Sequence, residues 1–223
     1  MVISGAADSY GIYLAGRGSN TLTNNATVKV NRSSAYAEGK KAVALYAENG
    51  SINNSGALEV GAKDAVINGG IGIETDGGNV TNGGTITVYG NGSAIKAADG
   101  SITNNASATV YGNGSVLNGQ NGNVTNNEKG QLNIYTDGKA SAYGIYLAGS
   151  TGNTITNKAS IFINRYGAYA QAASTGNYGI WTDNAKIVNS GDISLGSSTA
   201  GLSGIYGLYA AGSGSIENSG VIN

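Results

Sequence analysis

The sequence predicts an all-β fold, a parallel β-helix of about seven to eight coils with three short strands in each coil. The chain of 223 residues has 38 glycines, no proline, a hydrophobic fraction of 40% and a net charge of −1. It therefore has apolar surface to bury and little self-repulsion. No stretch keeps a helical period, whereas one short phrase returns along the whole chain, as in stacked repeats.

The repeated phrase is an apolar residue followed two positions later by asparagine, and it occurs eight times. The apolar anchors are Leu22, Ile52, Val80, Ile102, Val124, Ile155, Ile187 and Ile216. The asparagines are Asn24, Asn54, Asn82, Asn104, Asn126, Asn157, Asn189 and Asn218. We expect these amides to turn inward at a corner and to form a hydrogen-bonded ladder along the stack, although a row of ligand-binding amides is an alternative.

Each coil contains three segments that have strand character. The first is the anchor segment, the second is an apolar pair such as Leu58 and Val60, and the third carries an apolar residue such as Leu45 or Ile95 before the next anchor. Apolar and polar residues alternate with a period of two in all three segments, which predicts one buried face per strand. The anchors lie 22 to 32 residues apart, so the smallest coil has 22 residues and the longer ones carry loops.

Aromatic residues recur beside the apolar positions and are expected to point outward. One set directly follows the third-strand position and comprises Tyr13, Tyr46, Tyr146, Trp181 and Tyr209. A second set follows the second-strand pair and comprises Tyr89, Tyr111 and Tyr135. Such files arise from simple cross-strand packing, but they are also candidate binding faces for sugars or protein partners.

Candidate catalytic residues are few. The chain has no histidine and no cysteine, which excludes nucleophile and base pairs of the Ser-His or Cys-His type. The acidic residues that share one position of the repeat are Glu48, Asp76 and Asp183, and Asp99 lies one position later; all four are in turns. Aspartate and asparagine are common in turns for conformational reasons, so we assign no catalytic residue, metal site or cofactor and do not expect an enzyme.

Charge and hydropathy exclude two further classes of partner. The 12 basic and 13 acidic residues are scattered and form no basic stripe, so nucleic acid is not an expected partner. No window approaches the run of roughly 18 apolar residues that spans a bilayer, so we expect no membrane insertion by this segment.

Three phrases resemble the passenger domains of bacterial type V autotransporters. They are Gly-Ile-Tyr-Leu-Ala-Gly at residues 144–149, Gly-Ile-Tyr-Gly-Leu-Tyr-Ala at residues 204–210 and Ser-Ile-Glu-Asn-Ser-Gly-Val-Ile at residues 215–222. The resemblance implies a right-handed β-helix that is displayed on the surface of a Gram-negative bacterium through an outer-membrane translocator. Both ends of the chain fall within repeats, so we expect residues 1–223 to be a single uncapped β-helix segment of a longer repeat protein.

The resemblance also implies a function. We expect a structural and adhesive segment, a rigid rod that attaches to a host or bacterial surface protein or glycan through its aromatic residues or its long loops, which include residues 32–41 and 164–177. The alternative is a polysaccharide lyase or hydrolase on the same fold.

Overall fold

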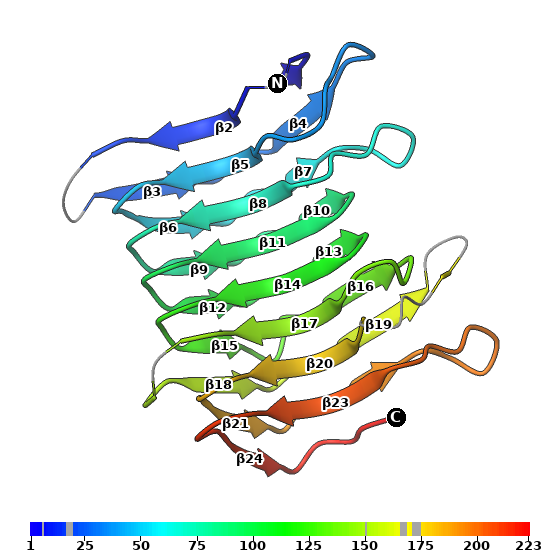
Figure 1. The fold of residues 1–223 in the computed structure, drawn as a ribbon. Coiled ribbons are helices and arrows are strands. Elements are labelled where there is room, and N and C mark those ends of the chain that lie inside the picture. The colour runs from blue at the N-terminus through cyan, green and yellow to red at the C-terminus, as the bar shows by residue number, and fades with distance from the viewer. Residues whose placement is uncertain (6, 17–19, 150, 166–168, 171–174) are drawn as a thin grey trace.

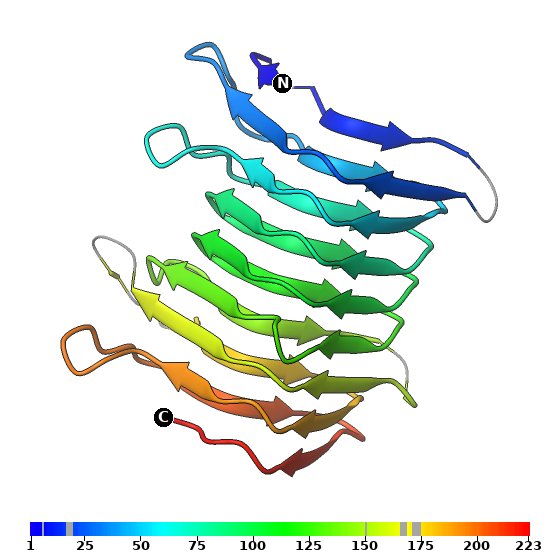
Figure 2. The ribbon, with the colours of Figure 1, turned by 180° about the vertical axis from the view of Figure 1, so that it is seen from behind.

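Every regular element described in the chain is a β-strand. The computed structural model describes residues 1–5, 7–16, 20–149, 151–165, 169–170 and 175–223, and within these residues the chain forms 24 strands. The strands make three parallel sheets of eight strands each, which we number sheet 1 to sheet 3. Figure 1 shows the strands stacked between an N-terminal and a C-terminal end, and Figure 2 shows the same stack from behind. The predicted right-handed parallel β-helix is confirmed, with about eight coils.

The three sheets have the following strands. Sheet 1 contains β1 (Val2–Ile3), β4 (Val28–Arg32), β7 (Leu58–Val60), β10 (Ile86–Tyr89), β13 (Ala108–Tyr111), β16 (Leu132–Thr136), β19 (Ile161–Arg165) and β22 (Ile193–Leu195). Sheet 2 contains β2 (Ser9–Leu14), β5 (Ala42–Ala47), β8 (Gly70–Thr75), β11 (Gly92–Ala97), β14 (Gly114–Gly119), β17 (Ala142–Leu147), β20 (Asn177–Thr182) and β23 (Ile205–Ala210). Sheet 3 contains β3 (Thr21–Asn24), β6 (Ser51–Asn54), β9 (Val80–Asn82), β12 (Ile102–Asn104), β15 (Val124–Asn126), β18 (Thr154–Asn157), β21 (Lys186–Asn189) and β24 (Ser215–Asn218).

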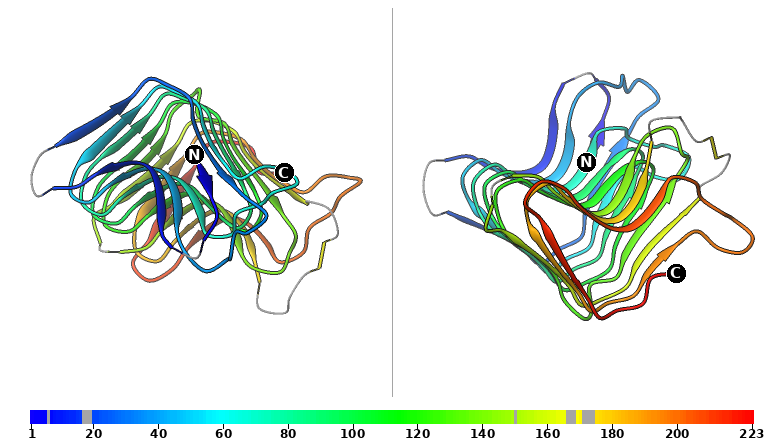
Figure 3. Two further views of the ribbon diagram at one scale, coloured as in Figure 1. Left: turned by 90° about the horizontal axis from the view of Figure 1, so that it is seen from above. Right: turned by 60° about the horizontal axis from the view of Figure 1, so that its bottom comes forward.

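The chain visits sheet 2, sheet 3 and sheet 1 in turn, so each strand pairs with strands one coil away rather than with its neighbours in sequence. The two views in Figure 3 show the three walls that each coil forms around the interior. The anchors pair one to one, for example Val80 with Ile102 and Ile102 with Val124. Loops of different length therefore leave the register of the strands unchanged.

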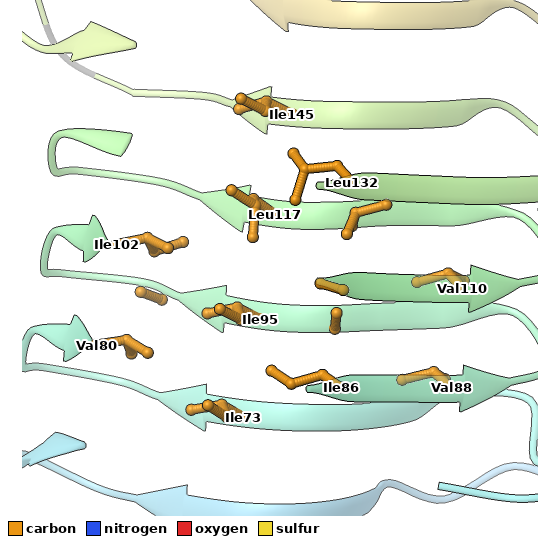
Figure 4. Packing of buried hydrophobic residues seen from close by; sticks show 14 of the residues in the cluster. Ile73, Val80, Ile86, Val88, Ile95, Ile102, Val110, Leu117, Leu132 and Ile145 are labelled. Carbon is orange, nitrogen blue, oxygen red and sulfur yellow. The ribbon is translucent and has the colours of Figure 1, made fainter. Parts of the chain in front are cut away.

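The core consists of files of like residues. In sheet 2, Ile73, Ile95, Leu117 and Ile145 follow one another in register, and Figure 4 shows them beside files from the other two sheets. Each of these four side chains is completely buried. Burial of one such side chain contributes about 1.5–3 kcal/mol. Each added coil thus extends the same three apolar files.

Sheet 2 departs from the predicted alternation of buried and exposed residues. Its strands contain an extra inward position that takes no part in the residue pairing, for example Gly144 between Tyr143 and Ile145. A Cβ at Gly144 would lie 2.3 Å from Ile161 Cγ2 in the core. The prediction of strict alternation was wrong here because two consecutive residues face inward, and this bulge leaves both flanking side chains, Tyr143 and Tyr146, on the outside.

The repeated asparagines form a continuous amide ladder inside the corner that follows sheet 3. Asn82 Nδ2 donates to Asn104 Oδ1 at 2.8 Å, and Asn104 Nδ2 donates to Asn126 Oδ1 at 3.0 Å. The same bond joins every consecutive pair from Asn24 to Asn218, at 2.7 to 3.0 Å. Asn24 to Asn189 are buried, and Asn218 in the last coil is exposed.

The ladder also holds the turn of its own coil. The second amide hydrogen of Asn104 bonds to the carbonyl oxygen of Ala106, two residues later, at 2.8 Å. Within the described residues this local bond recurs at every ladder asparagine except Asn126, where Glu128 and Lys129 are inserted. A Cβ at Gly84 would lie 1.9 Å from the carbonyl oxygen of Gly56, so the coils approach each other closely beside the ladder.

The longer connections leave from one corner, between sheet 1 and sheet 2. They include residues 33–41, 137–141 and 196–204, together with a further loop at residues 61–69 that was not among those predicted. They project from the same side of the stack in Figure 1. The predicted loop at residues 164–177 falls partly outside the described residues, at 166–168 and 171–174.

Replacement of Asn104 by alanine should lower the stability. It removes two bonds to neighbouring coils and one to Ala106, and it leaves buried polar groups of Asn82 and Asn126 without those partners. We expect a loss of about 1–3 kcal/mol, measured as the free energy of unfolding in urea.

The control is Asn133→Ala, at a half-buried outer position that makes one long bond of 3.3 Å to Thr109 Oγ1. Its loss should stay within about 0.5 kcal/mol. Equal stability of the Asn104→Ala variant and the unmodified protein would show that the ladder does not hold the coils together.

Candidate functional site

Three successive strands of sheet 2 place two aromatic side chains each on the outer face of the rod. The six residues, here called the aromatic surface, are Tyr143 and Tyr146 on β17, Tyr178 and Trp181 on β20, and Tyr206 and Tyr209 on β23. In each strand the aromatic pair is separated by a glycine and an apolar residue, which form the inward bulge. The bulge is what allows two outward rings three positions apart.

The rings form two rows along the axis of the stack. Tyr143, Tyr178 and Tyr206 are stacked with centroids 5.0 and 4.9 Å apart and planes within 9°. Trp181 lies between Tyr146 at 4.6 Å and Tyr209 at 6.4 Å, again with nearly parallel planes. The planes of one row lie at 71° to 75° to those of the other, so the rows meet edge to face.

This geometry decides what the aromatic surface presents to a partner. The faces of Tyr178 and Trp181 are turned toward the rings of the adjacent coils, so their edges and polar atoms remain accessible. Offset-stacked and edge-to-face contacts contribute about 0.5–1.5 kcal/mol per pair beyond area burial. The aromatic surface is therefore a rigid array whose side chains are already ordered before any partner binds.

A second aromatic cluster lies on sheet 2 near the N-terminal end. Tyr10, Tyr13 and Tyr46 contact one another with centroids 5.0 to 5.2 Å apart. Tyr13 is 45% exposed, whereas Tyr46, which also lies outside the main core, is only 7% exposed. Tyr46 packs with Tyr10, Val43 and Ile71 in a small apolar cluster outside the main core.

The predicted file on sheet 1 forms a third row. Tyr89, Tyr111 and Tyr135 stack with centroids 4.9 Å apart and planes within 8°. Phe162 continues the row with an edge contact to Tyr135 at 6.2 Å. All four rings are partly exposed, and the row lies on a different sheet from the aromatic surface. The two predicted sets of aromatic residues therefore lie on different sheets and do not form one surface.

Between the two aromatic clusters of sheet 2, the outer face carries an ion-pair network in which two partly exposed lysines flank one buried carboxylate. Glu74 is 1% exposed, and its Oε1 accepts hydrogen bonds from Lys41 Nζ at 2.9 Å and from Lys96 Nζ at 3.0 Å. These three residues lie far apart along the chain, so no pattern in the sequence connects them. They link three consecutive coils and separate the two clusters.

The acidic residues of the predicted row bond to adjacent coils. The Tyr13 hydroxyl donates to Glu48 Oε1, and the Tyr46 hydroxyl donates to Asp76 Oδ2 at 2.5 Å. Asp99 Oδ1 accepts from Asn121 Nδ2 at 2.8 Å. Asp183 Oδ1 accepts from the Gly149 N–H at 3.1 Å. Among the described residues no group of three or more acidic side chains could hold a metal ion.

Four members of the aromatic clusters were missed from the sequence. Tyr10, Tyr143, Tyr178 and Tyr206 each stand three residues before a selected aromatic residue, with glycine directly after them. The signal was the phrase aromatic-Gly-apolar-aromatic, which occurs at residues 10–13, 143–146, 178–181 and 206–209. In a strand with a strict period of two, residues three positions apart lie on opposite faces. The first tyrosine of each pair was therefore not predicted to point outward.

Comparison with known proteins identifies no relative. No protein-family model, curated protein or solved structure matches this chain. The described residues also contain no helix that is long and apolar enough to cross a membrane.

Stability should depend on alkaline pH through Tyr46. Burial, together with the hydrogen bond to Asp76, raises the pKa of Tyr46 above its ordinary value of 10.0. The stabilisation is fully present below pH 10.0 and is lost as the pH rises through the higher pKa of the folded protein. Between the two values this tyrosine lowers the free energy of unfolding by about 1.4 kcal/mol per pH unit, and Tyr46→Phe should remove that slope.

The measurement is urea unfolding at a series of pH values above neutrality. Asp76→Asn is the matched variant, because it removes the neighbouring charge while Tyr46 stays buried, and it should keep a large part of the slope. Identical alkaline slopes for Tyr46→Phe and the unmodified protein would contradict this role.

Proposed function

We propose that this chain is a structural and adhesive segment of an autotransporter passenger. In this proposal it is a rigid rod displayed outside a Gram-negative bacterium, held there by an outer-membrane translocator, and it attaches to a host or bacterial surface protein or glycan. The observation that carries the proposal is the aromatic surface, six ordered aromatic side chains gathered on three consecutive strands.

The aromatic surface has the properties of a protein contact site. Tyrosine and tryptophan are enriched at the centres of protein interfaces, where they dominate the binding energy. The rings of β17 and β20 have a neighbouring strand on both sides and are still partly exposed, namely Tyr143, Tyr146, Tyr178 and Trp181. Because the rings are already held by stacking, binding would cost little side-chain entropy.

The rod supports this role by its construction. The amide ladder and the apolar files repeat in every coil, so the position of each outer side chain is determined by the coils on either side. A scaffold of this kind holds a contact surface away from its point of attachment without bending at a linker. The absence of cysteine also suits a chain that crosses membranes unfolded, since no disulfide can trap it.

The alternative, a carbohydrate-cleaving enzyme, needs two carboxyl groups that face one glycosidic bond. The acids Glu48, Asp76, Asp99 and Asp183 instead accept hydrogen bonds from side chains or backbone of neighbouring coils. Among the described residues, none of these four acids forms a pair of carboxyl groups that faces a common substrate site, so this alternative has no supporting observation.

Binding of the purified chain to cultured host cells, to other Gram-negative bacteria and to a glycan array tests the proposal. Trp181→Ala should weaken the binding by about 30-fold, the effect of losing a central aromatic contact of about 2 kcal/mol. The control is Tyr111→Ala, which removes the central ring of the stacked row on sheet 1.

Circular dichroism should show that both variants keep the β fold. Equal binding by Trp181→Ala and the unmodified protein would exclude the aromatic surface as the contact site. Release of reducing sugar from a polysaccharide by the unmodified chain would favour the enzyme instead.

A further inference from the structure

The residue after each ladder asparagine forms an outward file along the same corner. Its backbone N–H donates to the carbonyl oxygen of the ladder asparagine one coil before, as Gly83 N does to Asn54 O at 2.7 Å and Asn105 N does to Asn82 O at 2.7 Å. Where this file carries side chains, they bond along the axis, as Ser55 Oγ does to Asn25 Oδ1 at 2.6 Å. At Gly83 the file has no side chain and is interrupted.

The interruption leaves a groove over the first four coils. The groove has a volume of about 260 Å³, and its lining includes Thr23, Asn53, Ser55, Thr81, Gly83 and Asn105. Thr23, Asn53 and Thr81 are in register on the outer face of sheet 3, one from each of three consecutive strands. Their side chains therefore repeat at the strand spacing of about 4.8 Å.

The groove offers hydrogen-bonding groups that the protein itself does not use. Among the described residues the Asn53 side-chain amide makes no hydrogen bond, and Asn105 uses only its Oδ1, which accepts from Asn127 Nδ2 at 2.8 Å. The Asn53 amide and Asn105 Nδ2 are thus available as donors. The hydroxyl groups of Thr23 and Thr81 lie on the same lining and can both donate and accept.

The lining restricts the chemistry of the ligand. It contains no ionisable side chain, so a charged ligand would find no oppositely charged partner there, and an uncharged ligand is favoured. An apolar ligand would leave the amide and hydroxyl groups unpaired, which is also costly. By contrast, the next hollow along this corner is lined by Glu128, Lys129 and Lys158 and is charged. The volume lies below the roughly 300–1,000 Å³ of pockets that enclose a drug-sized molecule, so it suits one small ring.

We propose that this groove is a subsite for one sugar residue of a neutral glycan, bound through its hydroxyl or acetamido groups. The site lies on sheet 3 and its corner, whereas the aromatic surface lies on sheet 2, so the proposal goes beyond the adhesive role assigned to that surface. In the stacked rows of sheet 2, each inner ring has its faces covered by the rings of the adjacent coils. A glycan in the groove is instead bound by hydrogen bonds and does not need an exposed ring face.

Gly83→Asn is the variant that tests the groove. A Cβ at Gly83 would meet only the Asn54 carbonyl oxygen, at the ordinary contact distance of 3.7 Å, so the backbone can accept a side chain. The new asparagine would continue the outward file between Ser55 and Asn105 and fill the groove. The matched control is Gly201→Asn, in the connection before β23, where a Cβ would meet nothing within 4 Å.

The probes are two neutral trisaccharides, one of glucose and one of N-acetylglucosamine, titrated into the whole ¹⁵N-labelled chain and followed by NMR. We expect shifts of the Asn53 and Asn105 side-chain amides and of the Gly83 backbone amide with at least one probe. Binding of only the second probe would identify the acetamido group as the recognised feature. Gly83→Asn should weaken binding at least about tenfold, whereas Gly201→Asn should not.

A second variant, Thr81→Val, keeps the branched shape and removes only the hydroxyl, and it should also weaken binding. The absence of shifts with both sugars would overturn the proposal, as would shifts that persist unchanged in Gly83→Asn or shifts confined to the Trp181 indole. Because cell attachment is tested through Trp181, failure of this subsite and failure of the adhesive role are distinguishable.

Discussion

The asparagine amide ladder is the interaction on which the rest of the structure depends. Each rung bonds to the coil after it and, in most coils, to its own turn, so one side chain fixes both the corner and the register. A shift of one residue would turn an apolar anchor out and break the ladder at that coil. Since buried amides without partners are costly, the register is specified more strongly than apolar packing alone would specify it. Coils of different length can therefore stack without disturbing the walls.

The fixed register also aligns the side chains on the outer surface along the axis of the stack. Because Tyr146, Trp181 and Tyr209 occupy the same position in three successive coils, they stack along the axis without further adjustment. The same rule places Lys96 beside Glu74, and Lys41, directly before β5, reaches Glu74 from the coil on the other side. Where one coil has glycine in place of a side chain, as at Gly83, the rule produces a gap. The outer surface thus consists of files of side chains. Its candidate sites are the aromatic surface, where two files consist of aromatic side chains, and the groove, where Gly83 leaves a file without a side chain.

The sequence was sufficient for the fold because the repeat itself carries the physical constraint. The anchors and the asparagines occupy one register, and the structure pairs them in that register. The outer surface was less predictable. The bulge at Gly144 breaks the period of two, which hid Tyr143, and the burial of Tyr46 depends on Tyr10 and Ile71 in adjacent coils. Such contacts join residues that are close only after stacking, so a position in the sequence does not show whether its side chain is covered.

The slow exchange of the ladder amides is the most direct test of this account. If the bonds hold the coils in register, the side-chain amide protons of Asn82, Asn104, Asn157 and Asn189 should exchange with deuterium as slowly as the backbone N–H of Ile102, which is paired within sheet 3. Exchange can be followed for each group by two-dimensional NMR of the folded chain. Protection of these side-chain protons equal to that of the core backbone is the result we predict. Exchange of the same protons as fast as that of an exposed asparagine such as Asn53 would contradict the account.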